Sequence, residues 1–233
     1  MKPCAPSVLV HVQTLKDVLI RHCIDMAATG RLTTVSRVLI ATLQAHGYLS
    51  DEIIALELFG MHGLWITRDY AHLCSDLEVY EVNTVYARYA RKFLPNAVII
   101  NADSIHALLT RHLRKKEYNF IISDNPVRGV FGGRYCEHFD LFPEVGDYIR
   151  SGVLLLNFIY DTQKATLSPE QCQRREQFYG AVNPQILDAV LSYEKQLHRG
   201  IKDYVFLPRD DGNSFLALIL ETARNSEELV GRR

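Results

Sequence analysis

The chain has 233 residues, of which 48% are hydrophobic and 23% charged, and its formal net charge is -1. This composition is typical of a globular protein with a sizeable core, and the length suits one large α/β domain or a domain with a small accessory. The near-zero charge provides no global positive field that would attract nucleic acid or an acidic membrane. We interpret the one basic run, "RHLRKK" at Arg111 to Lys116, as a solvated helix end rather than an RNA contact.

The five cysteines are scattered, and none lies in a C-x-x-C pair. This pattern argues against a disulfide framework and favours a reducing compartment. The histidines show no H-E-x-x-H spacing, so no metal site is predicted. The longest apolar run, "GVLLLNFIY", is too short to span a bilayer, and the N-terminus shows no signal pattern. The expected location is therefore the cytoplasm.

Residues 1–50 are predicted to form an N-terminal helical extension. The stretches "VLVHVQTLKDVLIRHCIDMAATG" and "TVSRVLIATLQAHGYL" place apolar residues at three-and-four spacing, which is typical of helices. Gly30 and Gly47 lie where these helices are expected to stop.

From Asp51 onward, short apolar runs alternate with helical stretches. Seven runs are predicted to be strands: Ile53–Phe59, Leu77–Val82, Ala97–Asn101, Tyr118–Ser123, Gly152–Tyr160, Tyr204–Leu207 and Phe215–Leu220. Such alternation predicts an α/β fold with a doubly wound, mostly parallel, Rossmann-like sheet. The last two runs are separated only by the turn-rich "PRDDGNS", which predicts a C-terminal antiparallel hairpin. Residues 51–233 are thus expected to form one domain, with a helical insertion near 161–202.

An acid follows each of the first four predicted strands. Glu57 and Glu81 stand at the ends of the first two runs, and Asp103 and Asp124 follow the next two. In an open α/β sheet the ligand lies beyond the carboxyl ends of the strands, where the strand order reverses. Each acid taken singly could simply cap a helix or lie on the surface. Their occurrence after four successive strands predicts a ligand site at this edge.

The loop after the first strand contains Gly60 and Gly63, where the absence of a side chain lets a ligand approach the backbone. Glu81 follows about twenty residues later, where an acid can hydrogen-bond ribose hydroxyls. The loop is not G-x-G-x-x-G, because Phe59 and Met61 occupy positions where dinucleotide folds prefer glycine. A pyrophosphate site is therefore not favoured.

Residues 51–221 resemble the class I S-adenosylmethionine-dependent methyltransferases in strand pattern and in the acids that follow the strands. "ELFGMHG" is similar to the family's first motif, and "DNPV" is similar to the motif after the fourth strand, without its aromatic residue. That missing aromatic weakens any assignment as a base-modifying nucleic-acid enzyme.

The resemblance implies S-adenosylmethionine as cofactor. The counterpart of Glu57 orients the methionine end through the loop, that of Glu81 binds the ribose diol, and that of Asp103 binds the adenine amino group. Asp103 followed by Ser104 could instead simply cap the next helix. The cofactor-binding residues expected on this basis are Glu57, Phe59, Gly60, Gly63, Glu81, Asp103, Ser104 and Asp124.

A second resemblance is to the spermidine synthase branch of the same superfold. It rests on "YEVNTVYARYARKFLPNAVIINADSIHALL" followed by "YNFIISDNPVRG". In that branch an acid after the fourth strand receives a proton from an attacking amine. The branch's glycine-dense first loop and N-terminal β-domain are absent here. Both resemblances imply an adenosyl-sulfonium ligand.

Four residues are candidates for catalysis: Asp124, Asn125, Tyr135 and His138. If the acceptor is an amine, Asp124 could accept its hydrogen bond or proton while Asn125 orients it. The glycine-containing tract Gly129–Phe142 could form a lid whose Arg134, Tyr135, Glu137 and His138 line the acceptor site. An ordinary surface loop with a few packed aromatics is the alternative.

The leading hypothesis is a methyltransferase that acts on a small or medium acceptor by in-line transfer. One alternative is aminopropyltransferase-like group transfer. Another is a non-catalytic protein that binds an adenosyl ligand or a partner. The expected partner is a small-molecule acceptor rather than a membrane or nucleic acid, and a homo-oligomer is left open.

Overall fold

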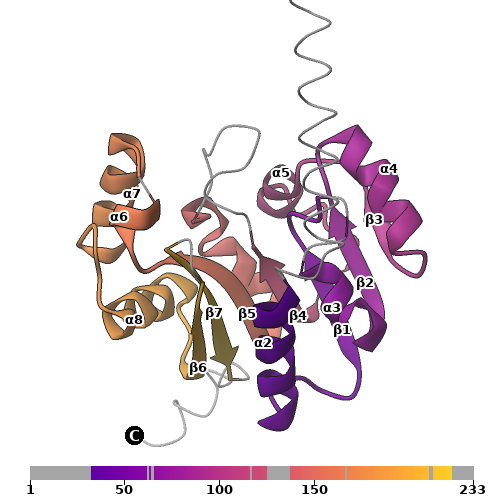
Figure 1. Ribbon diagram of the computed structural model, residues 1–233, viewed down its shortest axis with the longest axis horizontal. Coiled ribbons are helices and arrows are strands. Elements are labelled where there is room, and N and C mark those ends of the chain that lie inside the picture. Colours follow the sequence, from indigo (N-terminus) through magenta and orange to yellow (C-terminus); the bar gives the residue numbers. More distant parts are fainter. Residues whose placement is uncertain are drawn as a thin grey trace, which may run out of the picture.

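The computed structural model describes residues 33–61, 63, 66–115, 117–124, 137–165, 167–209 and 212–221. In these ranges the chain forms a seven-stranded sheet with helices on both faces (Figure 1). The first predicted helix lies outside the described residues. No helix in the described part of the chain is long and apolar enough to cross a membrane.

All seven predicted strands are confirmed. Their bounds are β1 Ile53–Glu57, β2 Cys74–Tyr80, β3 Val98–Ile100, β4 Tyr118–Ser123, β5 Ile149–Ile159, β6 Ile201–Pro208 and β7 Asn213–Leu220. They lie in the order β3-β2-β1-β4-β5-β7-β6. Strands β1 to β5 pair in parallel, whereas β7 runs antiparallel to both β5 and β6, which confirms the hairpin. The strand order therefore reverses between β1 and β4, which is where such sheets bind ligands.

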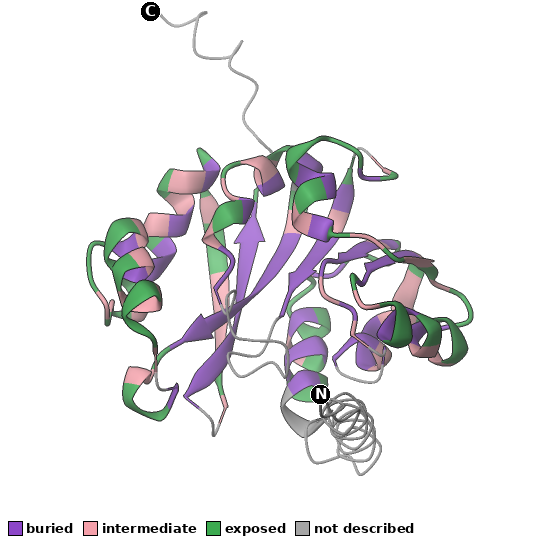
Figure 2. Ribbon diagram, turned by 90° about the horizontal axis from the view of Figure 1, so that it is seen from above, coloured by how far each residue is buried: buried purple, intermediate pink, exposed green. Residues whose placement is uncertain are grey.

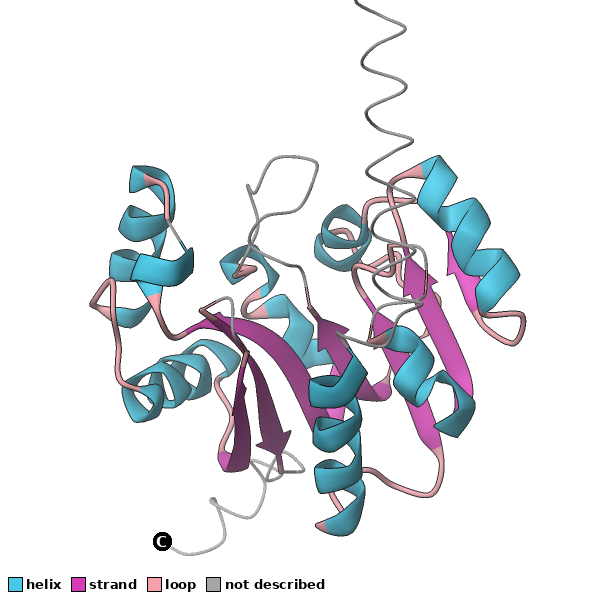
Figure 3. Ribbon diagram, viewed as in Figure 1, coloured by secondary structure: helices cyan, strands magenta, loops and turns pink. Residues whose placement is uncertain are grey.

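The helices cover both faces of the sheet, as Figure 3 shows. One face packs against α2 (Thr33–Ala45), α3 (Thr67–Tyr70) and the end of α4 (Thr84–Phe93). The other face packs against α5 (Ser104–Leu109), η2 (Phe139–Leu141), η3 (Glu144–Tyr148), α7 (Pro169–Tyr179) and α8 (Ile186–Leu197). The short η1 (Ala71–Leu73) and α6 (Thr162–Ala165) complete the described elements. Helices α6, α7 and α8 all lie between β5 and β6, in the segment predicted to be a helical insertion.

Local capping explains where two of these helices begin. The Asn83 side chain accepts hydrogen bonds from the backbone N–H groups of Val85 and Tyr86 at the start of α4. Ser168 and Gln171 form a reciprocal capping box at the start of α7, where Pro169 occupies the first turn. These contacts satisfy N–H groups that the first helical turn would leave without partners.

The central strands are buried on both faces, as the colouring of Figure 2 shows. Along β5, Val153 and Leu155 face one core cluster, while Leu154 and Leu156 face the other. Every residue of β7 is buried. This two-sided burial explains why these strands appear in the sequence as continuous apolar runs.

The predicted second helix is present as α2, and it packs directly on the sheet. Its Leu39 and Leu43 are fully buried in the same cluster as Phe120 of β4. Gly47 has a φ of +66° just beyond the end of the helix, as expected of a helix stop.

The basic run starts at the C-terminal end of α5, as interpreted from the sequence, because the N–H groups of Arg111 and His112 donate to Leu108 O and Ala107 O of the last helical turn. The helix stops at Leu109, and Arg111 has a φ of +60°, which breaks the helical path. Arg111 pairs with Asp147, and both Arg114 and Lys115 pair with Asp76. The described cations of the run thus lie at and beyond the helix end, where they are engaged in intramolecular ion pairs.

Candidate functional site

The carboxyl ends of β1 and β4 bring Glu57 and Asp124 to the same edge of the sheet. Glu57 lies opposite Ile122 in the parallel ladder, and Asp124 follows Ile122 by two residues on the same strand face. Glu57 has an exposed fraction of 1% and Asp124 of 3%. Two carboxyl groups therefore share a buried position at the point where the strand order reverses.

Glu57 is held by hydroxyl groups of α3. Tyr70 Oη donates to Glu57 Oε2 at 2.5 Å, and Thr67 Oγ1 donates to the same oxygen at 3.4 Å. Glu57 Oε1 makes no hydrogen bond with the described residues. Burial raises the pKa of Glu57 to about 8, to which the charge of Asp124 adds, while the hydrogen bond from Tyr70 acts in the opposite direction. Glu57 is therefore mostly protonated at neutral pH.

The glycines of the first loop make room for neighbouring elements of the fold. Gly60 N–H donates to Tyr80 O at 2.9 Å, and a Cβ on Gly60 would lie only 2.0 Å from Val79 Cγ1. Gly63 has a φ of +75°, and a Cβ there would lie 2.8 Å from Leu94 Cδ1. β2 and Leu94, which follows α4, thus approach these glycines closely, and the contact of the glycines with the cofactor stays a prediction.

Glu81 lies just beyond β2 and orders the turn that follows. Its Oε1 accepts from the backbone N–H of Asn83 at 2.6 Å. Burial raises the pKa of Glu81, and backbone hydrogen bonds from Asn83 and Met61 oppose that shift. The next residue, Val82, is 71% exposed, so an apolar side chain faces outward beside a carboxylate.

Asp103 caps α5. Its Oδ1 accepts from the backbone N–H groups of Ile105 at 2.9 Å and of His106 at 3.1 Å, while Ser104 is buried. The capping interpretation is therefore confirmed. A ligand role for the exposed Asp103 stays a prediction.

Asp124 is paired with a cation that we did not predict. Arg209 Nη1 lies 3.3 Å from Asp124 Oδ1, and Arg209 Nη2 donates to Asn157 Oδ1 at 2.8 Å. The guanidinium also stacks over Phe215, with its Cζ 4.8 Å from the ring centroid. Arg209 lies in "PRDDGNS", which the sequence analysis interprets only as a turn. The sequence feature that could have indicated a role for Arg209 in the site is its position after a strand.

His138 is buried against the first loop rather than exposed. Its ring stacks on Phe59 with 4.0 Å between centroids, and it is 5% exposed. Burial lowers the pKa of His138 to about 3, so the ring is neutral at physiological pH. This geometry gives His138 and Phe59 a packing role, and their predicted site roles stay untested.

The neighbouring Glu137, which we had placed among residues lining an acceptor site, forms a buried network instead. Arg175 Nη1 pairs with Glu137 Oε2, and Tyr179 Oη donates to Oε1 at 3.1 Å. The Arg175 side chain also donates to the backbone oxygens of Val182 and Ile159. This network fastens the segment before η2 to α7 and β5, so the lining role of Glu137 was wrong.

Two of the candidate catalytic residues, Asn125 and Tyr135, lie outside the described residues. So does most of the tract predicted to form a lid. Among the residues that the structure describes, no group of His, Cys, Asp or Glu side chains could hold a metal ion.

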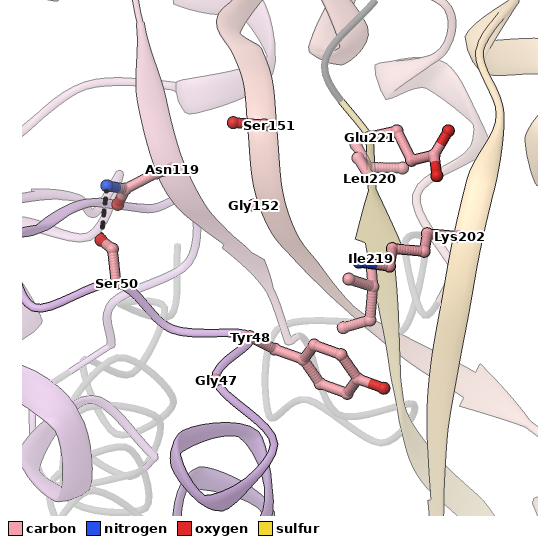
Figure 4. Close-up of a pocket in the computed structure, with 10 residues that line it drawn as sticks. All are labelled: Gly47, Tyr48, Ser50, Asn119, Ser151, Gly152, Lys202, Ile219, Leu220 and Glu221. Atoms are coloured by element: carbon pink, nitrogen blue, oxygen red, sulfur yellow. Dashed lines mark hydrogen bonds between the residues drawn. The ribbon is translucent and has the colours of Figure 1, made fainter.

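A cavity of about 570 Å³ opens at the opposite edge of the sheet (Figure 4). It is lined by residues from the loop before β1 and from the amino-edge ends of β4 to β7: Gly47, Tyr48, Ser50, Asn119, Ser151, Gly152, Lys202, Ile219, Leu220 and Glu221. None of the predicted site residues is among them. The acids and the cavity thus lie at different edges, and the topological argument favours the edge that carries the acids.

No protein-family model and no curated protein matches the sequence. Solved structures do match the fold. A complex of Trm1 from Pyrococcus horikoshii with S-adenosylmethionine has a TM-score of 0.56 at 14% identity, over 83% of this chain and 56% of that chain. A TehB-like SAM-dependent methyltransferase from Corynebacterium glutamicum has a TM-score of 0.53 at 11% identity, over 90% of this chain and 100% of that one. Magnesium protoporphyrin IX methyltransferase from Synechocystis, with bound SAH, has a TM-score of 0.53 at 10% identity, over 83% of this chain and 84% of that chain. The chain therefore has the fold of the class I S-adenosylmethionine-dependent methyltransferases.

Proposed function

We propose that this chain, which has the class I methyltransferase fold, binds S-adenosylmethionine at the carboxyl edge of its sheet and transfers the methyl group to a small or medium acceptor. The observation that carries the proposal is the succession of acids at one edge: Glu57, Glu81 and Asp103 at or just beyond the ends of β1, β2 and β3. Two of the solved proteins of this fold are complexes with this cofactor or its product.

The edge formed by β2 and β3 suits the adenosine part. The Glu81 carboxylate is fixed by the Asn83 N–H and can accept hydrogen bonds from two ribose hydroxyls. The exposed Val82 offers apolar surface against which an adenine ring can pack. Asp103 uses Oδ1 for capping, so its Oδ2 is the oxygen proposed to accept from the adenine amino group.

The edge of β1 suits the methionine part. Glu57 Oε1 is a buried atom without a hydrogen bond among the described residues, and a buried polar atom of this kind gains from a bound partner. Because Oε2 accepts from Tyr70 and Thr67, the proton of the neutral carboxyl stands on Oε1, which can donate to the carboxylate of the cofactor's methionine part. Glu57, Glu81, Val82 and Asp103 therefore fit S-adenosylmethionine, the cofactor that the fold implies.

For transfer, the bound sulfonium supplies a good leaving group. The chain must then hold the acceptor in line with the methyl group, and good orientation alone can be worth about 7–11 kcal/mol. Asp124 lies at the end of β4, where it can accept a hydrogen bond from an acceptor N–H or O–H. Because it is paired with Arg209, we assign it an orienting role in preference to that of a proton acceptor.

The same ion pair favours one second candidate. A carboxylate paired with a cation is a weaker base, so the pairing is compatible with a protein that binds an adenosyl ligand without catalysis. Aminopropyl transfer, in contrast, needs an acid that takes a proton from an amine, and a pairing with arginine weakens Asp124 for that task.

The first experiment is isothermal titration calorimetry of the full chain with S-adenosylmethionine and with S-adenosylhomocysteine. Micromolar affinity, about -8 kcal/mol, is expected for at least one of them. Incubation with methyl-labelled cofactor and separate pools of small molecules and RNA then tests transfer. Binding with no labelled product in either pool would support the non-catalytic candidate, and no binding at all would refute both.

A further inference from the structure

Arg209 is fixed above the ends of two central strands. Its Nη1 contacts Asp124 beyond β4, and its Nη2 donates to Asn157 in β5. Its backbone is held as well, because its N–H donates to Asn213 O at 2.7 Å and its carbonyl accepts from Tyr160 Oη at 2.9 Å. The guanidinium therefore cannot swing away from Asp124 without breaking several contacts.

Among the residues that the structure describes, the charges around this point nearly cancel. Asp124 contributes one negative charge, and Arg209, whose side chain is 11% exposed, contributes one positive charge. Glu57 also faces this edge, but burial raises its pKa to about 8, so it is mostly uncharged at neutral pH. The other titratable groups against Glu57 in the described part of the chain are Tyr70 and Cys74, whose pKa values are raised by burial, so both are neutral there too.

This balance matters for ligands that differ by one charge. S-adenosylmethionine carries a positive sulfonium, whereas S-adenosylhomocysteine carries a neutral thioether at the same position. An isolated buried carboxylate would favour the sulfonium, because the interaction of two charges is strong where water is excluded. An arginine paired with that carboxylate opposes this preference.

We propose that Arg209 is a specificity-determining residue, which neutralises Asp124 and so removes the site's electrostatic preference for the charged methyl donor over its neutral product. The inference rests on the proposed function, because it needs an adenosyl ligand at this edge. Its consequence is that the wild-type protein binds the product about as tightly as the donor.

The test is calorimetry of both ligands, at neutral pH, with four variants of the full chain. The quantity to compare is the dissociation constant of S-adenosylhomocysteine divided by that of S-adenosylmethionine. Arg209→Gln should raise this ratio about tenfold, and Arg209→Lys, which keeps the charge, should leave it near the wild-type value. Asp124→Asn removes the negative charge that faces Arg209 and should lower the ratio about tenfold. The double variant, with both Arg209→Gln and Asp124→Asn, should return close to the wild-type ratio.

The ratio is measured on folded protein, with circular dichroism of each variant as the control. If Arg209→Gln does not fold, Asp124→Asn alone still tests the sign of the effect. An unchanged ratio in the folded single variants would overturn the role of Arg209 while leaving the proposed function intact. If neither ligand binds the wild-type protein, the proposed function fails, and the role of Arg209 fails with it.

Discussion

Tyr70 Oη donates a 2.5 Å hydrogen bond to Glu57 Oε2, and this contact joins α3 to the end of β1 inside the core. Both side chains are almost entirely buried. The hydroxyl stabilises the carboxylate form, yet burial and the neighbouring Asp124 outweigh it, so the pKa of Glu57 is raised to about 8. A carboxyl that keeps its proton in the folded state makes stability depend on pH.

The sign of that dependence follows from proton binding. The ordinary pKa of a glutamate is 4.5, so between pH 4.5 and about 8 the folded protein binds more protons at Glu57 than the unfolded chain does. The free energy of unfolding should therefore fall as pH rises through this window, by up to about 1.4 kcal/mol per pH unit for one proton. Burial raises the pKa values of Glu81 and Glu137 as well, which adds in the same direction.

Glu57→Gln should remove the Glu57 part of this dependence. We expect the variant to be more stable than wild type at pH 8, and to lose less stability between pH 5 and pH 8. Urea unfolding at both pH values measures this. Parallel losses in the two proteins would mean that Glu57 is already ionised in the folded state.

Glu81→Ala should weaken S-adenosylmethionine binding by about 1.5–3 kcal/mol, the range for hydrogen bonds to a charged group. The matched control is Glu117→Ala, which removes an exposed glutamate just before β4. Calorimetry compares the two. Wild-type affinity in the Glu81 variant would show that Glu81 does not bind the ribose.

Gly60→Ala should destabilise the fold, because its Cβ would lie 2.0 Å from Val79 Cγ1 and the sheet must shift to accept it. Overpacking of this kind costs about 1–3 kcal/mol. Gly200→Ala is the control, since its Cβ would meet only Glu194 Oε1 at 3.9 Å. Thermal unfolding of both variants measures the difference, and equal melting temperatures would contradict the packing role of Gly60.

Arg175→Met should cost about 3–5 kcal/mol of unfolding free energy, because it leaves Glu137 buried without its cation. The adjacent Arg174→Met removes a more exposed pair with Asp140, worth about 0–1 kcal/mol, and the contact of the guanidinium with the Phe139 ring, worth about 0.5–1 kcal/mol. Denaturant unfolding of the two variants side by side tests the contrast. If both lose the same amount, the buried network does not fasten the segment that precedes η2.

The sequence contained enough to predict the sheet because most of its strands are buried on both faces. Tyr118–Ser123 was predicted with the bounds that β4 has. In contrast, β2 starts at Cys74, earlier than predicted, since Ser75 and Asp76 are polar and lie where the strand is more exposed. Likewise, because Glu57 and Asp124 stand at the ends of predicted strands, the sequence was sufficient to predict that both lie at one edge of the sheet.

Contacts between residues that are far apart in the sequence could not be predicted from sequence patterns. Arg209 meets Asp124 across 85 positions, and Arg175 meets Glu137 across 38. Neither pairing follows from periodicity or local propensity, because both depend on how the elements pack. For the same reason the sequence could not show that Val79 is the neighbour that excludes a side chain at Gly60.

The most direct test of the central claim is the position of S-adenosylhomocysteine in a crystal structure of its complex with this chain. The account predicts the ribose against Glu81, the adenine over Val82 and the sulfur near the ends of β1 and β4. A ligand found instead in the cavity at the opposite edge, between Tyr48 and Lys202, would contradict it.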